Sequence, residues 1–353
     1  MKFNKILEIP PYDIGNKKKD ALSLLMHNQI ISYHTKKSKI YKKILNLKGI
    51  KSQKFKKISD MPYLPVRLFK DFDLRSIEKK KIFKTLFSSG TSGKGKSKIY
   101  LDKYNSEIQF KILQKITKTI LGKSRLPMLI IDKSLKNYNR NEFNAKIAAI
   151  KGFSVFGKDH TYLLNSDETI DYKSLNNFLK KYHKSKFLIF GFTSSIYDFL
   201  IKKIEKNKLL FDFQNSIILH GGGWKKLEKL NISNEKFKNE LKKKFKINII
   251  INYYGLIEQA GSIFIECKCG YFITSNYSDI LVRNSDLKIV KDGDLGFLQL
   301  FSLLPSSYPG HIILTEDLGK IIKDKNCKCF NGGKRFKVFG RVKDAEIRGC
   351  SDI

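Results

Sequence analysis

The chain has 353 residues, of which 41% are hydrophobic and 12% aromatic, enough for one large or two ordinary domains with a packed core. Lysine and arginine number 69 against 33 acidic residues, a formal net charge of +36. This composition excludes a disordered chain. No apolar run is long enough for a membrane span or an N-terminal signal peptide, so we expect a cytoplasmic globular protein.

The positive charge has two interpretations. It could attract nucleic acid or anionic lipid, and a basic nucleic-acid-binding protein is one alternative for function. However, the lysines are spread along the whole chain in short clusters, and we find no arginine-rich arm or aromatic-basic RNA motif. We therefore favour codon bias with a solvated lysine surface and do not expect nucleic acid as the partner.

The N-terminal part, residues 1–80, is predicted to be a mainly helical region packed on the core. Apolar residues recur at helical spacing in residues 20–27 and 38–45. Pro62 and Pro65 then indicate an extended segment.

Residues 81–293 alternate short apolar runs with helical stretches, which predicts an α/β core with a largely buried sheet. The expected strands cover 128–131, 187–190, 216–219 and 247–252, and the expected helices cover 174–184 and 234–245. Residues 294–353 are richer in glycine and alternating residues, which predicts a small β subdomain followed by a tail.

The strongest local pattern is a loop rich in glycine, hydroxyl groups and lysine. It consists of Ser88, Ser89, Gly90, Thr91, Ser92, Gly93, Lys94, Gly95, Lys96 and Ser97. Backbone N–H groups, hydroxyls and lysine ammonium groups of this kind bind phosphate. Because residues 90–97 also satisfy the Walker pattern, a P-loop NTPase or kinase is a serious alternative.

The residues after the loop discriminate between these alternatives. A Walker loop continues directly into a helix, whereas Ile99 and Leu101 alternate with polar neighbours as in a strand. We expect the helix to begin only at Ser106, where Ser106 and Gln109 form a possible capping box. A phosphate loop between two strands favours an adenylate-forming enzyme.

The loop resembles the signature of adenylate-forming enzymes, Ser/Thr-Ser-Gly-Ser/Thr-Ser/Thr-Gly-x-x-Lys, and further motifs follow in the family's order. They are Gly221, Gly222 and Gly223; Tyr253, Tyr254, Gly255 and Glu258; Thr315 and Asp317; Gly340, Arg341 and Asp344. Residues 63–70, 308–311 and 347–350 look characteristic of the LuxE-like acyl-protein synthetases within this superfamily. The resemblance covers nearly the whole chain.

The resemblance implies the layered α/β N-terminal-domain fold of these enzymes with a small β subdomain. It also implies ATP-dependent conversion of a carboxylic acid, expected to be a fatty acid, to acyl-AMP. Ser88 to Lys96 would hold the phosphates and Glu258 the Mg²⁺ ion. The three glycines and Tyr253 or Tyr254 with Gly255 would bind adenine, and Asp317 and Arg341 the ribose. Since the sequence ends soon after Arg341, the usual C-terminal lid domain with its catalytic lysine is expected to be absent.

Cys350 provides a candidate for the second step. In the LuxE-like enzymes a cysteine near the C-terminus takes the acyl group from acyl-AMP, which would make this protein an acid–thiol ligase. The resemblance suggests an acyl-reductase subunit as the final acceptor; a carrier protein or coenzyme A are further candidates. An incidental cysteine remains the alternative.

The other four cysteines form two C-x-C pairs, Cys267 with Cys269 and Cys327 with Cys329. Four thiolates are the number that a tetrahedral structural zinc site requires. We therefore predict a zinc ion that takes no part in the reaction, with four free thiols as the alternative.

Overall fold

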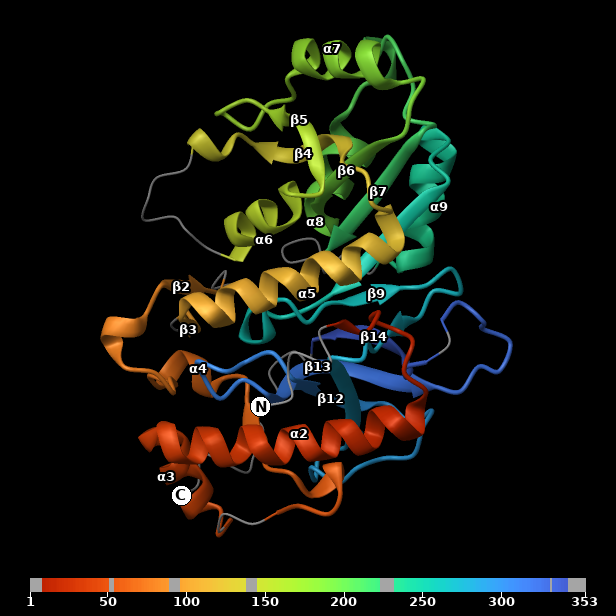
Figure 1. The fold of residues 1–353 in the computed structure, drawn as a ribbon. Helices are drawn as coiled ribbons and strands as arrows, with labels where there is room; N and C mark the ends of the chain where they lie inside the picture. Colours follow the sequence, from red (N-terminus) through yellow and green to blue (C-terminus); the bar gives the residue numbers. More distant parts are fainter. Residues whose placement is uncertain are drawn as a thin grey trace. The chain divides into compact units, whose positions relative to one another are not determined.

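The computed structural model describes residues 8–50, 54–88, 96–137, 145–222, 232–330 and 332–341 (Figure 1). The chain groups into two compact units, one formed by residues 1–116 and 256–353 and the other by residues 117–255. The domain boundaries predicted from sequence at 80/81 and 293/294 remain predictions. No helix in the described ranges combines the length and apolar character needed to cross a membrane.

The unit of residues 117–255 contains a parallel sheet whose strands lie in the order β8-β7-β6-β4-β5. The strands are β4 (Leu126–Lys133), β5 (Gly157–Leu164), β6 (Phe187–Phe192), β7 (Ser216–Gly221) and β8 (Ile249–Tyr254). The helices are α6 (Ala145–Ser154), α7 (Tyr172–Tyr182), α8 (Thr193–Ile196), which continues into a π-helical turn (Tyr197–Lys203), and α9 (Asn234–Phe245). The predicted α/β core, its four strands and its two helices are confirmed.

Alternating strand residues supply both faces of this sheet. Ile189 belongs to a buried cluster with residues of α7 and α9, such as Leu175 and Phe237. The next residue of β6, Phe190, stacks on Phe153 of α6 with ring centroids 4.8 Å apart. Because successive side chains of a strand point to opposite faces, helices cover both faces of the sheet, and its strands read as continuous apolar runs.

The other unit contains antiparallel strands in the order β11-β12-β13-β14-β10-β9, with β1 paired parallel to β13. They are β1 (Leu64–Pro65), β9 (Phe264–Glu266), β10 (Phe272–Ile273), β11 (Ser278–Arg283), β12 (Gly296–Ser302), β13 (Ile312–Ile322) and β14 (Arg335–Arg341). The N-terminal helices are α2 (Asn16–Lys37), α3 (Lys39–Leu47) and α4 (Leu68–Asp71). The extended segment predicted after Pro62 therefore ends early: only residues 64–65 pair as a strand, and burial of Phe69 fixes a short helix behind them.

Buried charges attach α2 to the sheet of this unit. The Lys19 amine, 4% exposed, donates a 2.7 Å hydrogen bond to the Thr274 hydroxyl. Burial alone would raise the pKa of the nearby Asp279, but Lys19 and Lys334 hold it below its usual value. Lys334 lies 3.0 Å from the Asp279 carboxylate. Each buried charge thus has a partner of opposite sign, without which its burial would be costly.

The segment after the predicted phosphate loop is a strand. β3 (Lys98–Leu101) pairs antiparallel with β2 (Lys84–Phe87), with Phe87 opposite Lys98. The amide of Ser97 donates to the Ser88 hydroxyl at 2.9 Å, and the amide of Ser88 donates to the Ser97 carbonyl at 3.1 Å. This hairpin contradicts the P-loop alternative, because a Walker loop would continue into a helix.

The next helix, α5 (Lys103–Leu121), begins three residues before the predicted start at Ser106. The Asp102 carboxylate accepts a 2.7 Å hydrogen bond from the amide of Asn105 and thereby caps the helix. Gln109, predicted to complete a capping box with Ser106, instead donates to the Tyr308 hydroxyl at 3.3 Å. The predicted capping box is wrong because Asp102 occupies the N-cap position first.

Replacing Asp102 by alanine should lower the free energy of unfolding by about 0.5–2 kcal/mol, since an amide of the first turn loses its acceptor. Ser106→Ala is the matched control and should change it by less than about 0.5 kcal/mol, because Ser106 lies within the helix. Urea unfolding followed by circular dichroism measures both. A larger loss for Ser106→Ala would restore the capping box predicted from sequence.

Candidate active site

The base of the phosphate loop is fixed by the hairpin. Ser88 and Ser97 close it through the two hydrogen bonds given above. Ser97 is 1% exposed, whereas Lys96 beside it is exposed to solvent. Ser89, Gly90, Thr91, Ser92 and Gly93 lie outside the described residues. The structure therefore shows the two ends of the predicted phosphate loop and an exposed Lys96 at one of them.

Glu258 lies in the 3₁₀ turn Ile257–Gln259 and is only 5% exposed. The neighbouring side-chain amide of Gln259 donates to the carbonyl of Gly310 at 2.8 Å. Gly310 has no room for a side chain, since a Cβ there would lie 2.5 Å from the Glu258 carbonyl oxygen and 2.4 Å from the Tyr308 ring. The loop that contains Tyr308 and Gly310 thus packs against the turn that contains Glu258.

Burial raises the pKa of Glu258 above its usual value. The Ser97 hydroxyl opposes this rise, as do the positive charges of Arg341 and Lys70. A buried carboxyl group on which positive charges act provides an oxygen ligand of the kind that hard cations prefer. Lys70 was not among the site residues predicted from sequence, although it ends the segment 63–70 that pointed to the family.

Asp317 and Arg341 are direct neighbours across β13 and β14. The Arg341 Nε atom lies 3.5 Å from Oδ1 of Asp317, which is 8% exposed. The Thr315 hydroxyl accepts a 3.1 Å hydrogen bond from the amide of Asp317 and donates to the Leu298 carbonyl at 2.9 Å. The two residues predicted to hold the ribose are thus brought together, with the strand backbone beside Asp317 fixed by Thr315.

In the unit of residues 117–255, Gly221 lies opposite Tyr253 in the parallel pair β7–β8. A Cβ at Gly221 would lie 2.5 Å from the Tyr253 ring and 2.7 Å from its carbonyl oxygen, so only glycine fits. Gly222 has a φ of +78°, a conformation that favours glycine. Gly223 lies outside the described residues.

The two tyrosines of the adenine motif differ in burial. Tyr253 is 8% exposed and packs on Phe153, with ring centroids 4.7 Å apart. Tyr254 is half-buried, and Gly255 after it is exposed. Because adjacent strand residues point to opposite faces, one of the two tyrosines fills the core, and Tyr254 has the more accessible ring.

The segment Phe190–Thr193, whose two phenylalanines around Gly191 predict an apolar lining for an acyl pocket, is largely core. Phe190 is fully buried against Phe153, while Phe192 is half-buried. The Thr193 hydroxyl hydrogen-bonds to Nδ1 of His220 at 3.0 Å. Burial lowers the pKa of His220 to about 3, so this histidine is neutral and structural near pH 7. Of the segment's side chains, Phe192 is therefore the most exposed.

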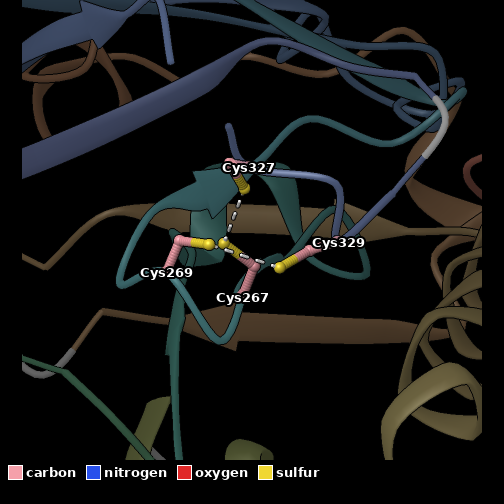
Figure 2. A group of neighbouring side chains, drawn as sticks. All are labelled: Cys267, Cys269, Cys327 and Cys329. Carbon is pink, nitrogen blue, oxygen red and sulfur yellow. Dashed lines mark hydrogen bonds between the residues drawn. The ribbon is translucent and has the colours of Figure 1, made fainter. Parts of the chain in front are cut away.

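Four cysteine sulfur atoms converge from two loops (Figure 2), all within 4.8 Å of one another. The Sγ atoms of Cys267 and Cys327 are 3.7 Å apart, and those of Cys269 and Cys329 are 3.6 Å apart. Zinc with four sulfur ligands at about 2.3 Å requires sulfur–sulfur distances of roughly 3.8 Å. Burial raises the pKa of Cys267 to about 11, and a bound cation would favour its thiolate. The donor set and its spacing fit zinc.

Comparisons with known proteins agree with the family that the sequence motifs indicate. A family model described as "Acyl-protein synthetase, LuxE" matches residues 3–353. No curated protein matches the chain.

Two solved structures of 2-hydroxyisobutyryl-CoA ligase are similar over 94% of this chain. One is an open conformation with 2-HIB-AMP and CoA, with a TM-score of 0.74, 14% identity and 77% of that chain covered. The other is the thioesterification state, with a TM-score of 0.70, 13% identity and 70% of that chain covered. These TM-scores show a shared fold and confirm the predicted fold class.

The raised pKa of Glu258 predicts how stability depends on pH. As pH rises through this pKa, the wild-type protein must ionise a buried carboxyl group and loses stability, whereas Glu258→Gln does not. The variant should therefore be the more stable protein above that pKa, by about 1.4 kcal/mol for each unit by which the folded-state pKa exceeds the unfolded one. The difference should vanish at lower pH.

Urea unfolding between pH 4 and 8 measures this difference. The control is Glu235→Gln, at an exposed glutamate in the first turn of α9, which should show no such trend. A Glu258→Gln variant that is less stable than wild type at pH 8 would mean that the carboxylate stabilises the fold instead.

Proposed function

The chain belongs to the LuxE acyl-protein synthetase family of adenylate-forming enzymes, and we propose that it activates a fatty acid with ATP and transfers the acyl group to a partner through Cys350. The observation that carries this proposal is the strand–loop–strand hairpin that Ser88 and Ser97 close, in the same compact unit as the buried Glu258. Complexes of the similar ligase contain an acyl-AMP and CoA. We place the reaction in the cytoplasm, where thiols stay reduced.

In the first step a carboxylate oxygen of the acid attacks the α-phosphorus of ATP, and pyrophosphate leaves with the bonding electron pair. The loop residues Ser88 to Gly93 and Lys96 would hold the phosphates and offset the charge that develops on the leaving group. Glu258 would hold Mg²⁺, which supplies charge neutralisation at the phosphate oxygens when it is bound. The Glu258 carboxylate supplies oxygen ligands, which that hard cation prefers.

The remaining contacts would orient the nucleotide. Tyr254 is the better candidate to stack on adenine, since Tyr253 fills the core. Gly221, Gly222, Gly223 and Gly255 would let the backbone approach the base. Asp317 would accept hydrogen bonds from the ribose hydroxyls, with Arg341 fixing its carboxylate.

In the second step the Cys350 thiolate would attack the acyl-AMP carbonyl, forming a thioester and releasing AMP. Cys350 lies outside the described residues, so this role rests on the family pattern at residues 347–350. The acceptor that follows is proposed to be an acyl-reductase subunit, or a carrier protein or coenzyme A thiol. The half-buried ring of Phe192 supports an apolar acid.

Pyrophosphate–ATP exchange across a panel of carboxylic acids tests the first step. We expect exchange that depends on a long-chain acid, and a roughly 10²–10³-fold loss in Lys96→Met. Radiolabelled acid should mark the wild-type protein through a hydroxylamine-labile bond, and Cys350→Ser should abolish the label while leaving exchange unchanged. Phosphate release without carboxylate dependence would refute adenylation, and a thioester label on Cys350→Ser would refute the role of Cys350.

We also propose that Cys267, Cys269, Cys327 and Cys329 bind one structural zinc ion. Support comes from sulfur spacings of 3.6 and 3.7 Å and from the turn that brings Cys269 into place. In that turn the amide of Gly270, at a φ of +77°, donates to the Cys267 carbonyl at 2.9 Å. Four protein ligands leave no open position, so the ion would stabilise the fold only.

The purified protein should contain one zinc ion per chain by mass spectrometry of the metal. Cys327→Ser should lose the metal and melt several degrees lower, because binding of the metal adds to the folding free energy. Cys350→Ser is the matched control and should retain the zinc ion and the wild-type melting temperature. Metal-free wild-type protein with an unchanged melting temperature would leave four free thiols as the correct description.

A further inference from the structure

The segment of residues 12–15, just before helix α2, packs against the loop that contains the second C-x-C pair. This cysteine loop consists of residues 327–330 and 332–333. The Tyr12 ring lies on the Phe330 ring, with centroids 4.2 Å apart and an angle of 33° between the planes. Tyr12 is only 4% exposed. The segment and the cysteine loop therefore share a buried aromatic contact.

Two further contacts join the segment to the backbone of the cysteine loop. Gly332 has no room for a side chain, since a Cβ there would lie 2.5 Å from the Ile14 carbonyl oxygen. The amide of Gly333 donates a 3.0 Å hydrogen bond to the side-chain oxygen of Asn16, the first residue of α2. Because both contacts need the loop backbone at its present place, the segment keeps its position only while the loop keeps its conformation.

The conformation of the cysteine loop depends in turn on its cysteines. Within the described part of this loop, no residue belongs to a helix or a strand. The Arg335 guanidinium donates to the carbonyls of Cys327 and Phe330, at 2.6 and 3.4 Å. The Cys327 and Cys329 sulfurs meet those of the other C-x-C pair, at the distances given above. A metal bound by all four thiolates would therefore fix a loop that has little regular structure of its own.

The Tyr12 side chain and the cysteines also belong to one small buried cluster. Its members are Tyr12, Cys267, Ile273 and Cys327, and Tyr271, Cys329 and Phe330 pack against it. A cluster of this size buries little apolar area, and small cores usually need a metal or another crosslink to stay folded. Loss of the ion should therefore loosen the contacts of Tyr12.

The parts of the chain on either side of the segment have attachments outside the cysteine loop. Before the segment, Asn276 donates to the carbonyls of Pro10 and Pro11, both at 2.6 Å. After it, His34 of α2 hydrogen-bonds to the Ser76 hydroxyl at 2.7 Å. Loss of the ion should therefore release the segment while its surroundings stay packed.

We propose that the four-cysteine site is a metal-dependent latch, which holds residues 12–15 on the cysteine loop while zinc is bound and releases them when zinc is removed. This inference rests on the zinc site proposed above and adds a conformational function to it. On release the four zinc–sulfur bonds break, a chelator takes up the ion, and the thiolates take protons from water. Each sulfur keeps its oxidation state, so the latch needs no oxidant.

Hydroxyl-radical footprinting of the full-length protein, read by mass spectrometry, measures the exposure of single tyrosine side chains. When a chelator removes the zinc, labelling of Tyr12 should rise at least about threefold, because the contacts that cover it open locally. Tyr41 of α3, 1% exposed, should stay protected, and Tyr33 of α2, 38% exposed, should keep its labelling. Zinc added back should restore the protection of Tyr12. The zinc content of every sample is measured in parallel.

Gly332→Ala tests the contact without removal of the metal. Its Cβ would overlap the Ile14 carbonyl, so Tyr12 should be labelled at least about threefold more than in wild type while one zinc ion per chain is retained. Gly15→Ala is the matched control, because a Cβ at Gly15 meets nothing within 4 Å and its φ of −62° suits alanine. It should match wild type in zinc content and in labelling.

The outcomes separate the latch from the zinc site. If zinc-bound and zinc-free wild type label Tyr12 alike, or if zinc-loaded Gly332→Ala keeps Tyr12 protected, the latch is refuted and the zinc site stands. Labelling of Tyr41 together with Tyr12 after zinc removal would show that the ion supports the whole region, which also refutes the latch. If the protein neither contains nor takes up zinc, the proposed metal site fails and the latch fails with it.

Discussion

The close contact between the Gly310 backbone and the carbonyl of Glu258 is the constraint on which the rest of this candidate site depends. A side chain at residue 310 would overlap both that carbonyl and the Tyr308 ring, with Cβ distances of 2.5 and 2.4 Å. Tyr308 in turn packs on Phe69 of α4 and accepts a hydrogen bond from Gln109 of α5. The buried carboxylate, the helix bearing Lys70 and the helix that follows the phosphate hairpin are therefore positioned by one loop. Even a small movement of that loop would displace all three, because packed interiors have little free volume.

The sequence was sufficient for the elements whose patterns have one physical interpretation. Ile99 and Leu101 are buried at alternate positions, as the strand period requires, and this periodicity separated a hairpin from a P-loop. Helix α9 begins after Ser233, which caps it, and was predicted with its observed bounds. The start of α5 was not predictable in this way, since Asp102 and Ser106 are both good N-cap residues. Tertiary packing decides such cases, as it also does where burial of Phe69 turns the expected extended segment into a short helix.

Within the candidate site, the sequence motifs indicated residue types, and the structure gives their positions. Two adjacent tyrosines are equivalent in a motif, yet the pleat of β8 buries Tyr253 against Gly221 and leaves Tyr254 the more accessible. The two C-x-C pairs predicted the four ligands of one zinc ion, and the structure brings their sulfurs together. That depends on the pairing of β10 with β14, where Ile273 lies opposite Arg335, and on Arg335, which donates to the Cys327 carbonyl at 2.6 Å. Such contacts join residues far apart in the chain, and local sequence periodicity does not predict them.

The net charge of +36 and the charge at Glu258 act on different scales. Exposed lysines interact through water, and salt screens them beyond about 8–10 Å, so their number says little about any one ligand. A cation near a buried carboxylate acts through a medium of lower dielectric constant and is screened much less. Positive charges that act on the buried Glu258, such as those of Arg341 and Lys70, are therefore not interchangeable with the many solvated lysines of this chain, although composition counts them alike.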